Sequence, residues 1–183
     1  LLTQLEREKI PHLERNSQRT FALADKLRGK ALAQRIARVS NDSVHQFMSA
    51  SIRQLKVLQA HDPAQCFAVL SPDSGIPVNF ALLLEANKQS GINAAQIAIL
   101  RDKTPYTPQD VSDADKEALV ARISEELRQR HGDSLALLES AEGLQSVEGQ
   151  TLLCAITIEN MEMLDDPADP VKMAFMRQMF FDD

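Results

Sequence analysis

The sequence predicts an all-α fold, an irregular bundle of seven to nine helices in a single domain over residues 1–183. The composition favours helices: it holds seven Phe, one Tyr and no Trp, whereas β-sandwiches show more Val, Thr and Tyr in alternating runs. Capping residues precede the apolar runs, and two apolar stripes recur at steps of three and four residues. A chain of 183 residues can bury a core within one domain.

The N-terminal region predicts a pair of antiparallel helices. The first has a cap at Asn16 or Ser17 and ends before the polar break at Ser40–Ser43. It contains Gly29, which costs about 1 kcal/mol relative to Ala, and we expect close packing on a neighbouring helix to explain it. The second helix ends near Pro63, and a short turn between two helices predicts a hairpin. Its apolar residues on one face are Val44, Phe47, Met48, Ile52, Leu55 and Leu58.

Shorter helices follow in the middle of the chain. Turn residues separate them in a loop at residues 71–77, and the most loop-like stretch is Lys103–Pro108. The helices predicted between these breaks span about residues 63–70, 78–89 and 93–101.

The last third of the chain predicts three or four further helices. One is capped at Thr107 or at Ser112 and ends at Gly132, with acidic residues at its start and basic residues at its end, which complements the helix dipole. A short helix from residue 133 or 134 to about 142 follows. The stretch at residues 150–164 contains β-branched residues that would suit a strand, but its length and spacing favour a buried helix. A final helix begins near Pro170.

The two cysteines, Cys66 and Cys154, both lie in apolar sequence. A pair this far apart forms one disulfide in an oxidising compartment, and the alternative is two buried free thiols. A disulfide here would contribute about 4 kcal/mol in the chain-entropy model. The sequence leans toward a periplasmic or other extracytoplasmic location on this ground, and it leaves both states of the cysteines open.

Charge is distributed unevenly along the chain. Residues 1–60 carry eleven Lys or Arg against five Asp or Glu, although the whole chain has a net charge of −6. Lys26, Lys30 and Arg38 come near one side of the first predicted helix and are candidates for a contact surface. The alternative is a solvated helix face, and nucleic-acid binding is not expected because the basic residues form no continuous stripe and only one aromatic accompanies them.

The C-terminal helix is the second candidate contact surface. Met173, Met176 and Phe180 belong to a run rich in Met and Phe, and Met is adaptable enough to serve many binding surfaces. The alternative is that this helix closes the core of its own domain. A protein partner or self-association is therefore an expectation.

No motif for catalysis, a cofactor or a metal is present in the sequence. It contains no phosphate-binding GxxxxGK[ST] loop, no GxGxxG fingerprint and no GxSxG elbow. No two of the histidines stand at metal-ligand spacing, these being His12, His45, His61 and His131. We therefore expect no enzyme, no metal and no cofactor.

The sequence therefore predicts a non-catalytic interaction or scaffold domain, and the beginning of the chain suggests its setting. We expect the chain, which starts at Leu1, to be a piece of a longer protein, with residues 1–15 as a stalk or a truncated helix. No apolar stretch is long enough to span a membrane, but an adjacent anchor would make this the soluble part of a tethered or exported envelope protein. The alternative function is a small-molecule-binding domain with an apolar pocket lined by Phe and Met.

Overall fold

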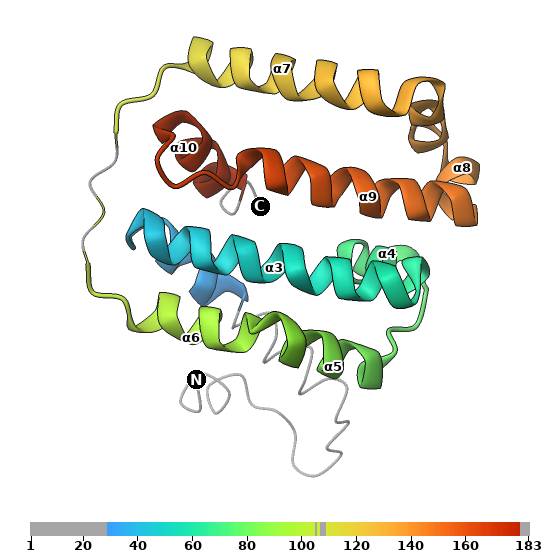
Figure 1. Ribbon diagram of the computed structural model, residues 1–183, viewed down its shortest axis with the longest axis horizontal. Coiled ribbons are helices and arrows are strands. Elements are labelled where there is room, and N and C mark those ends of the chain that lie inside the picture. The colour runs from blue at the N-terminus through green and yellow to red at the C-terminus, as the bar shows by residue number, and fades with distance from the viewer. Residues whose placement is uncertain (1–28, 105, 107–108, 180–183) are drawn as a thin grey trace, which may run out of the picture.

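The computed structural model describes residues 29–104, 106 and 109–179, and every regular element in these ranges is a helix (Figure 1). This confirms the predicted all-α bundle. Residues 29–36 are helical, but most of the first predicted helix lies outside the described residues, so the N-terminal hairpin remains a prediction. The further elements are α3 (Asn41–His61), α4 (Pro63–Leu70), the 3₁₀ turn η1 (Pro72–Ser74), α5 (Phe80–Ser90), α6 (Ile92–Arg101), α7 (Asp113–His131), the 3₁₀ segment η2 (Gly132–Glu139), α8 (Ala141–Gln145), α9 (Val147–Leu164) and α10 (Pro170–Met179).

Helix α3 is the centre of the bundle. Its N-cap is Ser40, whose side chain accepts a hydrogen bond from the Ser43 backbone N–H. Such a cap provides an acceptor for a backbone N–H of the first turn, which has no partner within the helix. The predicted apolar stripe of α3 is buried along its whole length. In Figure 1, α5 and α6 follow one another along one side of α3 and α9 runs along the other, and α3 also packs against α4.

Helix α7 forms the opposite edge of the bundle from α5 and α6 (Figure 1). It packs mainly against α10 and η2 and buries only Leu119 and Ile123. The predicted Ser112 cap is confirmed, because its side chain accepts a hydrogen bond from the Asp115 backbone N–H. The shallow burial of α7 means that much of its surface is charged and solvated.

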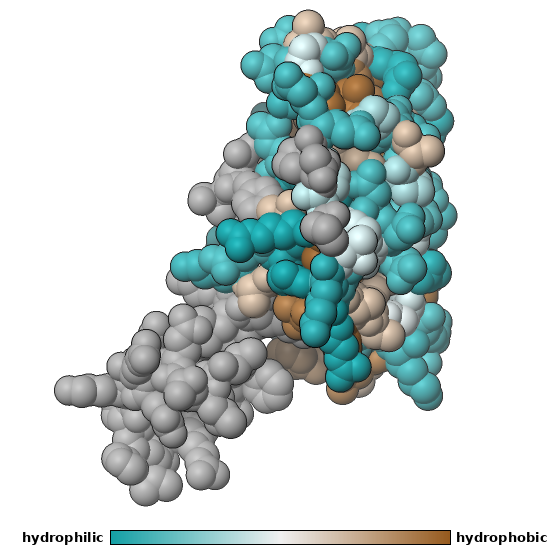
Figure 2. Space-filling model, turned by 90° about the vertical axis from the view of Figure 1, so that its left-hand side faces the viewer, coloured by the Kyte–Doolittle hydropathy of each residue, from teal (hydrophilic) through white to brown (hydrophobic). Residues whose placement is uncertain are grey.

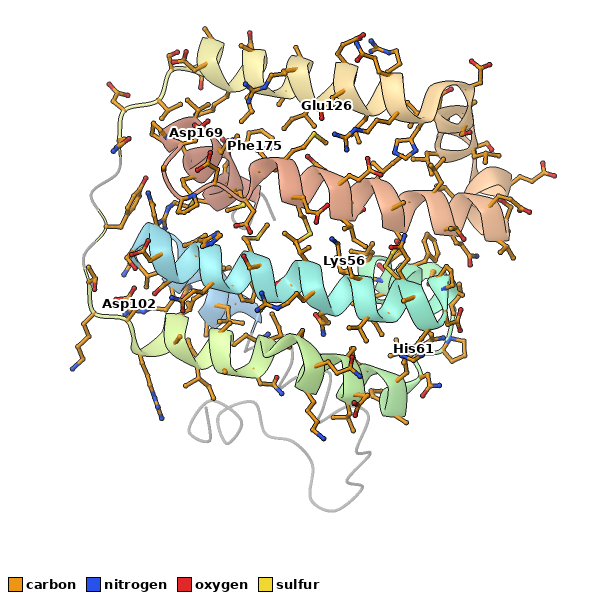
Figure 3. All side chains as sticks on the ribbon, in the orientation of Figure 1. Lys56, His61, Asp102, Glu126, Asp169 and Phe175 are labelled. Atoms are coloured by element: carbon orange, nitrogen blue, oxygen red, sulfur yellow. A yellow bond between two sulfur atoms is a disulfide. The ribbon has the colours of Figure 1, made fainter. Side chains whose placement is uncertain are left out.

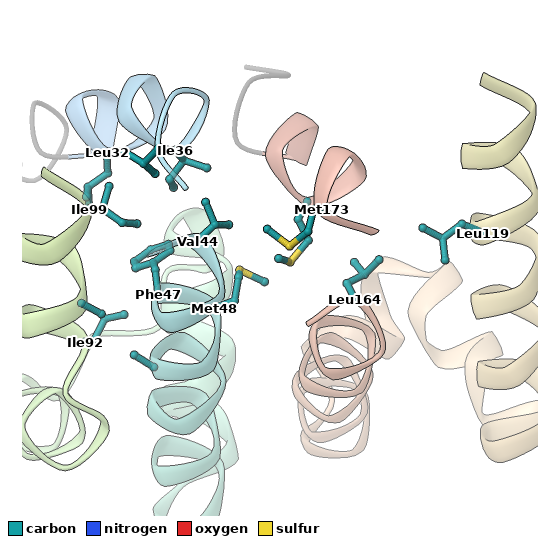
Figure 4. Close-up of a cluster of buried hydrophobic side chains, with 14 of the residues drawn as sticks. Leu32, Ile36, Val44, Phe47, Met48, Ile92, Ile99, Leu119, Leu164 and Met173 are labelled. Atoms are coloured by element: carbon teal, nitrogen blue, oxygen red, sulfur yellow. The ribbon is translucent and has the colours of Figure 1, made fainter. Parts of the chain in front are cut away.

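Two clusters of buried apolar side chains fill the bundle. The larger lies at the N-terminal end of α3, where residues from the helix over 29–36, α3, α6, α7, α9 and α10 meet. Figure 4 shows Leu32 beside Ile99 of α6, and Met173 of α10 between Met48 and Leu164. The smaller cluster lies further along α3, toward α4 and α9.

The disulfide joins α4 to α9 within the smaller cluster. Cys66 and Cys154 are fully buried, their Cα atoms are 6.0 Å apart, and the two sulfur atoms are paired. The sequence separation is 88 residues. The sequence identified these two cysteines but did not decide between a disulfide and two free thiols. The fold decides it, because it brings the two sulfur atoms together.

The start of α9 differs from the prediction because two glycines let two turns of backbone approach each other. A Cβ added to Gly149 would collide with the backbone carbonyl of Gly143, and one added to Gly143 would collide with the Leu137 carbonyl. Helix α9 begins at Val147, earlier than expected, and the short helix predicted from residue 133 or 134 to about 142 is instead η2 followed by α8. The ambiguous β-branched stretch is helical, as predicted.

Gly29 is the one glycine whose predicted role is wrong. Among the described residues, no atom outside its own helix lies within 4 Å of the position that a Cβ would occupy. Close packing therefore does not explain Gly29. The glycine lowers the stability of its helix relative to alanine, and no packing contact offsets this.

Candidate contact surface

The predicted basic residues lie in different settings from the predicted methionines. Lys30 and Arg38 are exposed, whereas Met173 and Met176 have no exposed surface. Lys26 and Phe180 lie outside the described residues. The proposal of Met173 and Met176 as surface residues is therefore corrected: α10 closes the core of its own domain.

The physical reason is a buried arginine that ties α10 to the N-terminal part of the bundle. Arg177 is only 5% exposed. Its guanidinium donates hydrogen bonds to the backbone carbonyls of Ile36 and Val39 and to the side chain of Asn41, the last at 2.8 Å. Its carbon Cζ lies 3.7 Å from the centre of the Tyr106 ring, a cation–π distance.

The buried Arg177 guanidinium forms no salt bridge with a carboxylate in the described part of the chain. The two carbonyls belong to the end of the helix over residues 29–36 and the turn after it, where the helix dipole favours a positive charge. Burial lowers the pKa of the Arg177 guanidinium, and Tyr106 opposes that shift. The two terminal nitrogens of the Arg177 guanidinium are therefore held by contacts within the fold, while its buried Nε has no hydrogen-bond partner among the described residues.

Asp102 connects the end of α6 to the start of α3 (Figure 3). Its Oδ2 accepts hydrogen bonds from the hydroxyls of Ser43 at 2.6 Å and Ser40 at 2.8 Å, and its Oδ1 accepts one from the Thr104 backbone N–H at 2.7 Å. The hydrogen bonds from Ser43, from the Thr104 backbone and from Ser40 hold the pKa of Asp102 well below its usual range. This carboxylate reinforces the cap of α3 and is occupied by that role.

A Ser, a His and an Asp come together beside α3 without forming a catalytic arrangement. Asp165 accepts a hydrogen bond from Ser49 Oγ at 2.7 Å, and its other oxygen lies 2.7 Å from His45 Nδ1. In a catalytic triad the serine hydroxyl is hydrogen-bonded to one nitrogen of the imidazole, and the carboxylate is hydrogen-bonded to the other nitrogen. Here the carboxylate separates the two, so these groups join α3 to the end of α9 structurally.

Two shallow hollows in the described surface lie along α7. The first is lined only by polar and charged side chains of α7, and the second adds Phe175 and Gln178 of α10 to residues of α7. Among the described residues no three His, Cys, Asp or Glu side chains are grouped as metal ligands would be. The described helices also include none with the length and hydropathy of a membrane span.

The exposed apolar side chains of the described residues gather on α5 and α6. Phe80 and Leu84 of α5 are 67% and 66% exposed, and Ile97 and Leu100 of α6 are 48% and 45% exposed. The remaining large apolar side chains that are exposed to this degree, Val120 and Val147, lie singly on α7 and α9. In Figure 2, which views the molecule from the side where α6 ends, apolar surface appears at the lower part, where α6 lies. We refer to Phe80, Leu84, Ile97 and Leu100 as the α5–α6 surface.

Polar contacts connect α5 to helices α3 and α4. The Arg53 guanidinium donates to the Ser90 carbonyl at 3.1 and 3.2 Å, and Gln54 donates to the Asn87 side chain. Gln65 of α4 accepts a hydrogen bond from the Asn79 backbone N–H, just before α5. These contacts hold α5 against the bundle, and Phe80 and Leu84 remain exposed on it.

The α5–α6 surface was not predicted from the sequence, although the sequence contains a signal for it. Residues 80–84 are five consecutive apolar residues. Five consecutive residues cover more than one full turn of a helix, which is wider than a single buried stripe. Such a run on a helix with one packed side must leave part of its apolar surface exposed.

Comparison of the chain with models of protein families, with curated proteins and with solved structures finds no match in any of the three.

Proposed function

We propose that this protein is a non-catalytic interaction domain that binds a protein partner through the α5–α6 surface. The observation that carries the proposal is the grouping of four exposed, large apolar side chains on two consecutive helices. Single exposed apolar residues are ordinary, whereas the largest grouped apolar patch on a monomer is often functional. The patch sits on helices whose other side is fixed by packing and hydrogen bonds, so a partner would meet a rigid surface.

The polar groups of the fold support a structural rather than a chemical role. Arg177, Asp102 and Asp165 each use their hydrogen bonds to connect helices. The Cys66–Cys154 disulfide supports an extracytoplasmic setting, because disulfides persist in oxidising compartments. A place in the cell envelope, as the soluble part of a tethered or exported protein, is a proposal that rests on this disulfide.

A crosslinking experiment tests the proposed function. The protein and its Leu84→Glu variant are crosslinked in extracts of the source cells, and the captured proteins are identified by mass spectrometry. Val147→Glu is the matched control, because Val147 is 71% exposed but lies on α9. The proposal predicts that Leu84→Glu loses partners that Val147→Glu retains. Identical capture by all three proteins contradicts it.

A further inference from the structure

We propose that the α5–α6 surface binds a second copy of this chain, as a two-fold symmetric dimer whose axis passes near Ser90. This inference rests on the proposed function and names the partner. Three properties of the surface support it: the rotation of its apolar residues about the helices, their spacing along the helices, and the positions of the charges beside them.

The four apolar residues lie on the same side of the α5–α6 pair. Helices α5 and α6 run in the same direction, one after the other (Figure 1), and Gly91 joins them with a φ of 72°. At about 100° per residue, Phe80 and Leu100 lie roughly 100° from the buried side of their own helices. By the same geometry Leu84 and Ile97 lie roughly 140–170° from it, in the same rotational sense. The turn at Gly91 thus aligns two separate apolar pairs into one strip.

The spacing of these residues is symmetric about Ser90. Phe80 lies ten residues before Ser90 and Leu100 ten residues after it, while Leu84 and Ile97 lie six before and seven after. A two-fold axis at this position places Phe80 opposite Leu100 of the second copy and Leu84 opposite Ile97. A two-fold interface requires a surface that is complementary to itself in this way.

The charges beside the strip favour the antiparallel arrangement of the two copies. The charged residues of α5 and α6 are Glu85, Lys88 and Arg101. In the antiparallel pairing Glu85 comes level with Ala95 and Gln96 of the second copy, Lys88 with Ile92 and Asn93, and Arg101 with Asn79 and Phe80, all of them uncharged. In a parallel pairing each charge would face its own copy, and like charges close together repel. The antiparallel pairing therefore buries the strip without a like-charge contact.

The size of the strip predicts a weak dimer. From Phe80 to Leu100 it is about 30 Å long and about 10 Å wide, on the order of 300 Å² on each copy. This is well below the roughly 800 Å² per partner of a standard interface. We therefore expect a dissociation constant in the micromolar to millimolar range, and a mass that depends on protein concentration.

Sedimentation equilibrium of the full chain, over micromolar to millimolar concentrations, tests the dimer. The expected mass rises from 20.3 kDa toward twice that value. Leu84→Glu and Ile97→Lys are each expected to weaken dimerisation at least tenfold, and Val147→Glu is expected to leave it unchanged. The double variant Leu84→Glu/Ile97→Lys is expected to regain dimerisation, because each introduced charge then faces its opposite on the second copy.

Each alternative result has a definite meaning. A wild-type chain that stays at 20.3 kDa throughout overturns the dimer, and this series needs no variant to fold. A double variant as monomeric as the single variants overturns the antiparallel pairing. If Val147→Glu weakens dimerisation as much as Leu84→Glu does, the two copies associate through another surface. A monomer that binds anionic lipid vesicles, and loses that binding in Leu84→Glu, assigns the surface to lipid. A monomer whose extract partners depend on Leu84 overturns the dimer and leaves the proposed function standing.

Discussion

Replacement of Arg177 by methionine tests whether one buried guanidinium holds the C-terminal helix to the N-terminal part of the bundle. Methionine keeps the apolar stem but removes every donor. The Ile36 and Val39 carbonyls and the Asn41 side chain then lose the partner that they share. The contact with the Tyr106 ring is lost as well.

The size of the effect follows from opposing contributions. Hydrogen bonds to a charged group contribute about 1.5–3 kcal/mol each, so three give roughly 4–9 kcal/mol. The cation–π contact adds about 1 kcal/mol. Removing the guanidinium also relieves a desolvation cost of several kcal/mol. We therefore expect Arg177→Met to lower the free energy of unfolding by about 3 kcal/mol, and the melting temperature of a domain of this size by roughly 6–12 °C.

Urea denaturation followed by far-UV circular dichroism measures this change. Arg128→Met is the control, because Arg128 lies on α7 and its side chain is 65% exposed beside Glu125; we expect a change below about 0.5 kcal/mol there. Tyr106 is the only tyrosine and the chain has no tryptophan, so the near-UV tyrosine signal reports on its contact with Arg177. A loss below about 0.5 kcal/mol in Arg177→Met, with an unchanged tyrosine signal, would show that the guanidinium does not hold α10 in place.

Three further predictions concern local features of the fold. Asp102→Asn should lower stability by about 1–2 kcal/mol at neutral pH. Because the hydrogen bonds hold the folded pKa of Asp102 low, its contribution is present above the unfolded pKa near 4 and fades below it; urea titrations that show a deficit independent of pH would contradict this. Gly149→Ala should destabilise the protein by at least about 1 kcal/mol, since its Cβ meets backbone, whereas Gly29→Ala should stabilise it by up to about 1 kcal/mol; thermal melts check the opposite signs. The unreduced, denatured protein should show no free thiol, and Cys66→Ala/Cys154→Ala should lose about 4 kcal/mol; two titratable thiols would rule out the disulfide.

Much of the helical architecture could be predicted because its signals are local. Ser112 caps α7 through a hydrogen bond to a residue three positions away, and the stripe of α3 is buried where the periodicity places it. The stretch around Ile158 became helical despite its β-branched residues, because it packs between α3 and α4 with no strand beside it in the described residues. The helix boundaries predicted around Gly143 and Gly149 were wrong, because a contact between two turns of the backbone decides them.

The candidate contact surface could not be predicted as readily, because exposure depends on which helices meet. Met173 and Phe80 both belong to apolar runs near polar residues, yet the first is fully buried and the second 67% exposed. The difference comes from Arg177, which ties α10 to the core, and from the packing of α5 on α3, to which Arg53 and Gln54 also connect it.

Local signals in the sequence were enough to predict that this chain forms helices, where most of them begin and end, and which cysteines can pair. These properties depend on residues within a few positions of one another, or on there being only two cysteines. Three outcomes follow from the packing of the helices instead: α10 belongs to the core, Cys66 meets Cys154, and α5 and α6 present one apolar strip outward. Those outcomes depend on the packing of helices distant in sequence, and on the turn at Gly91 that brings two apolar pairs to the same side.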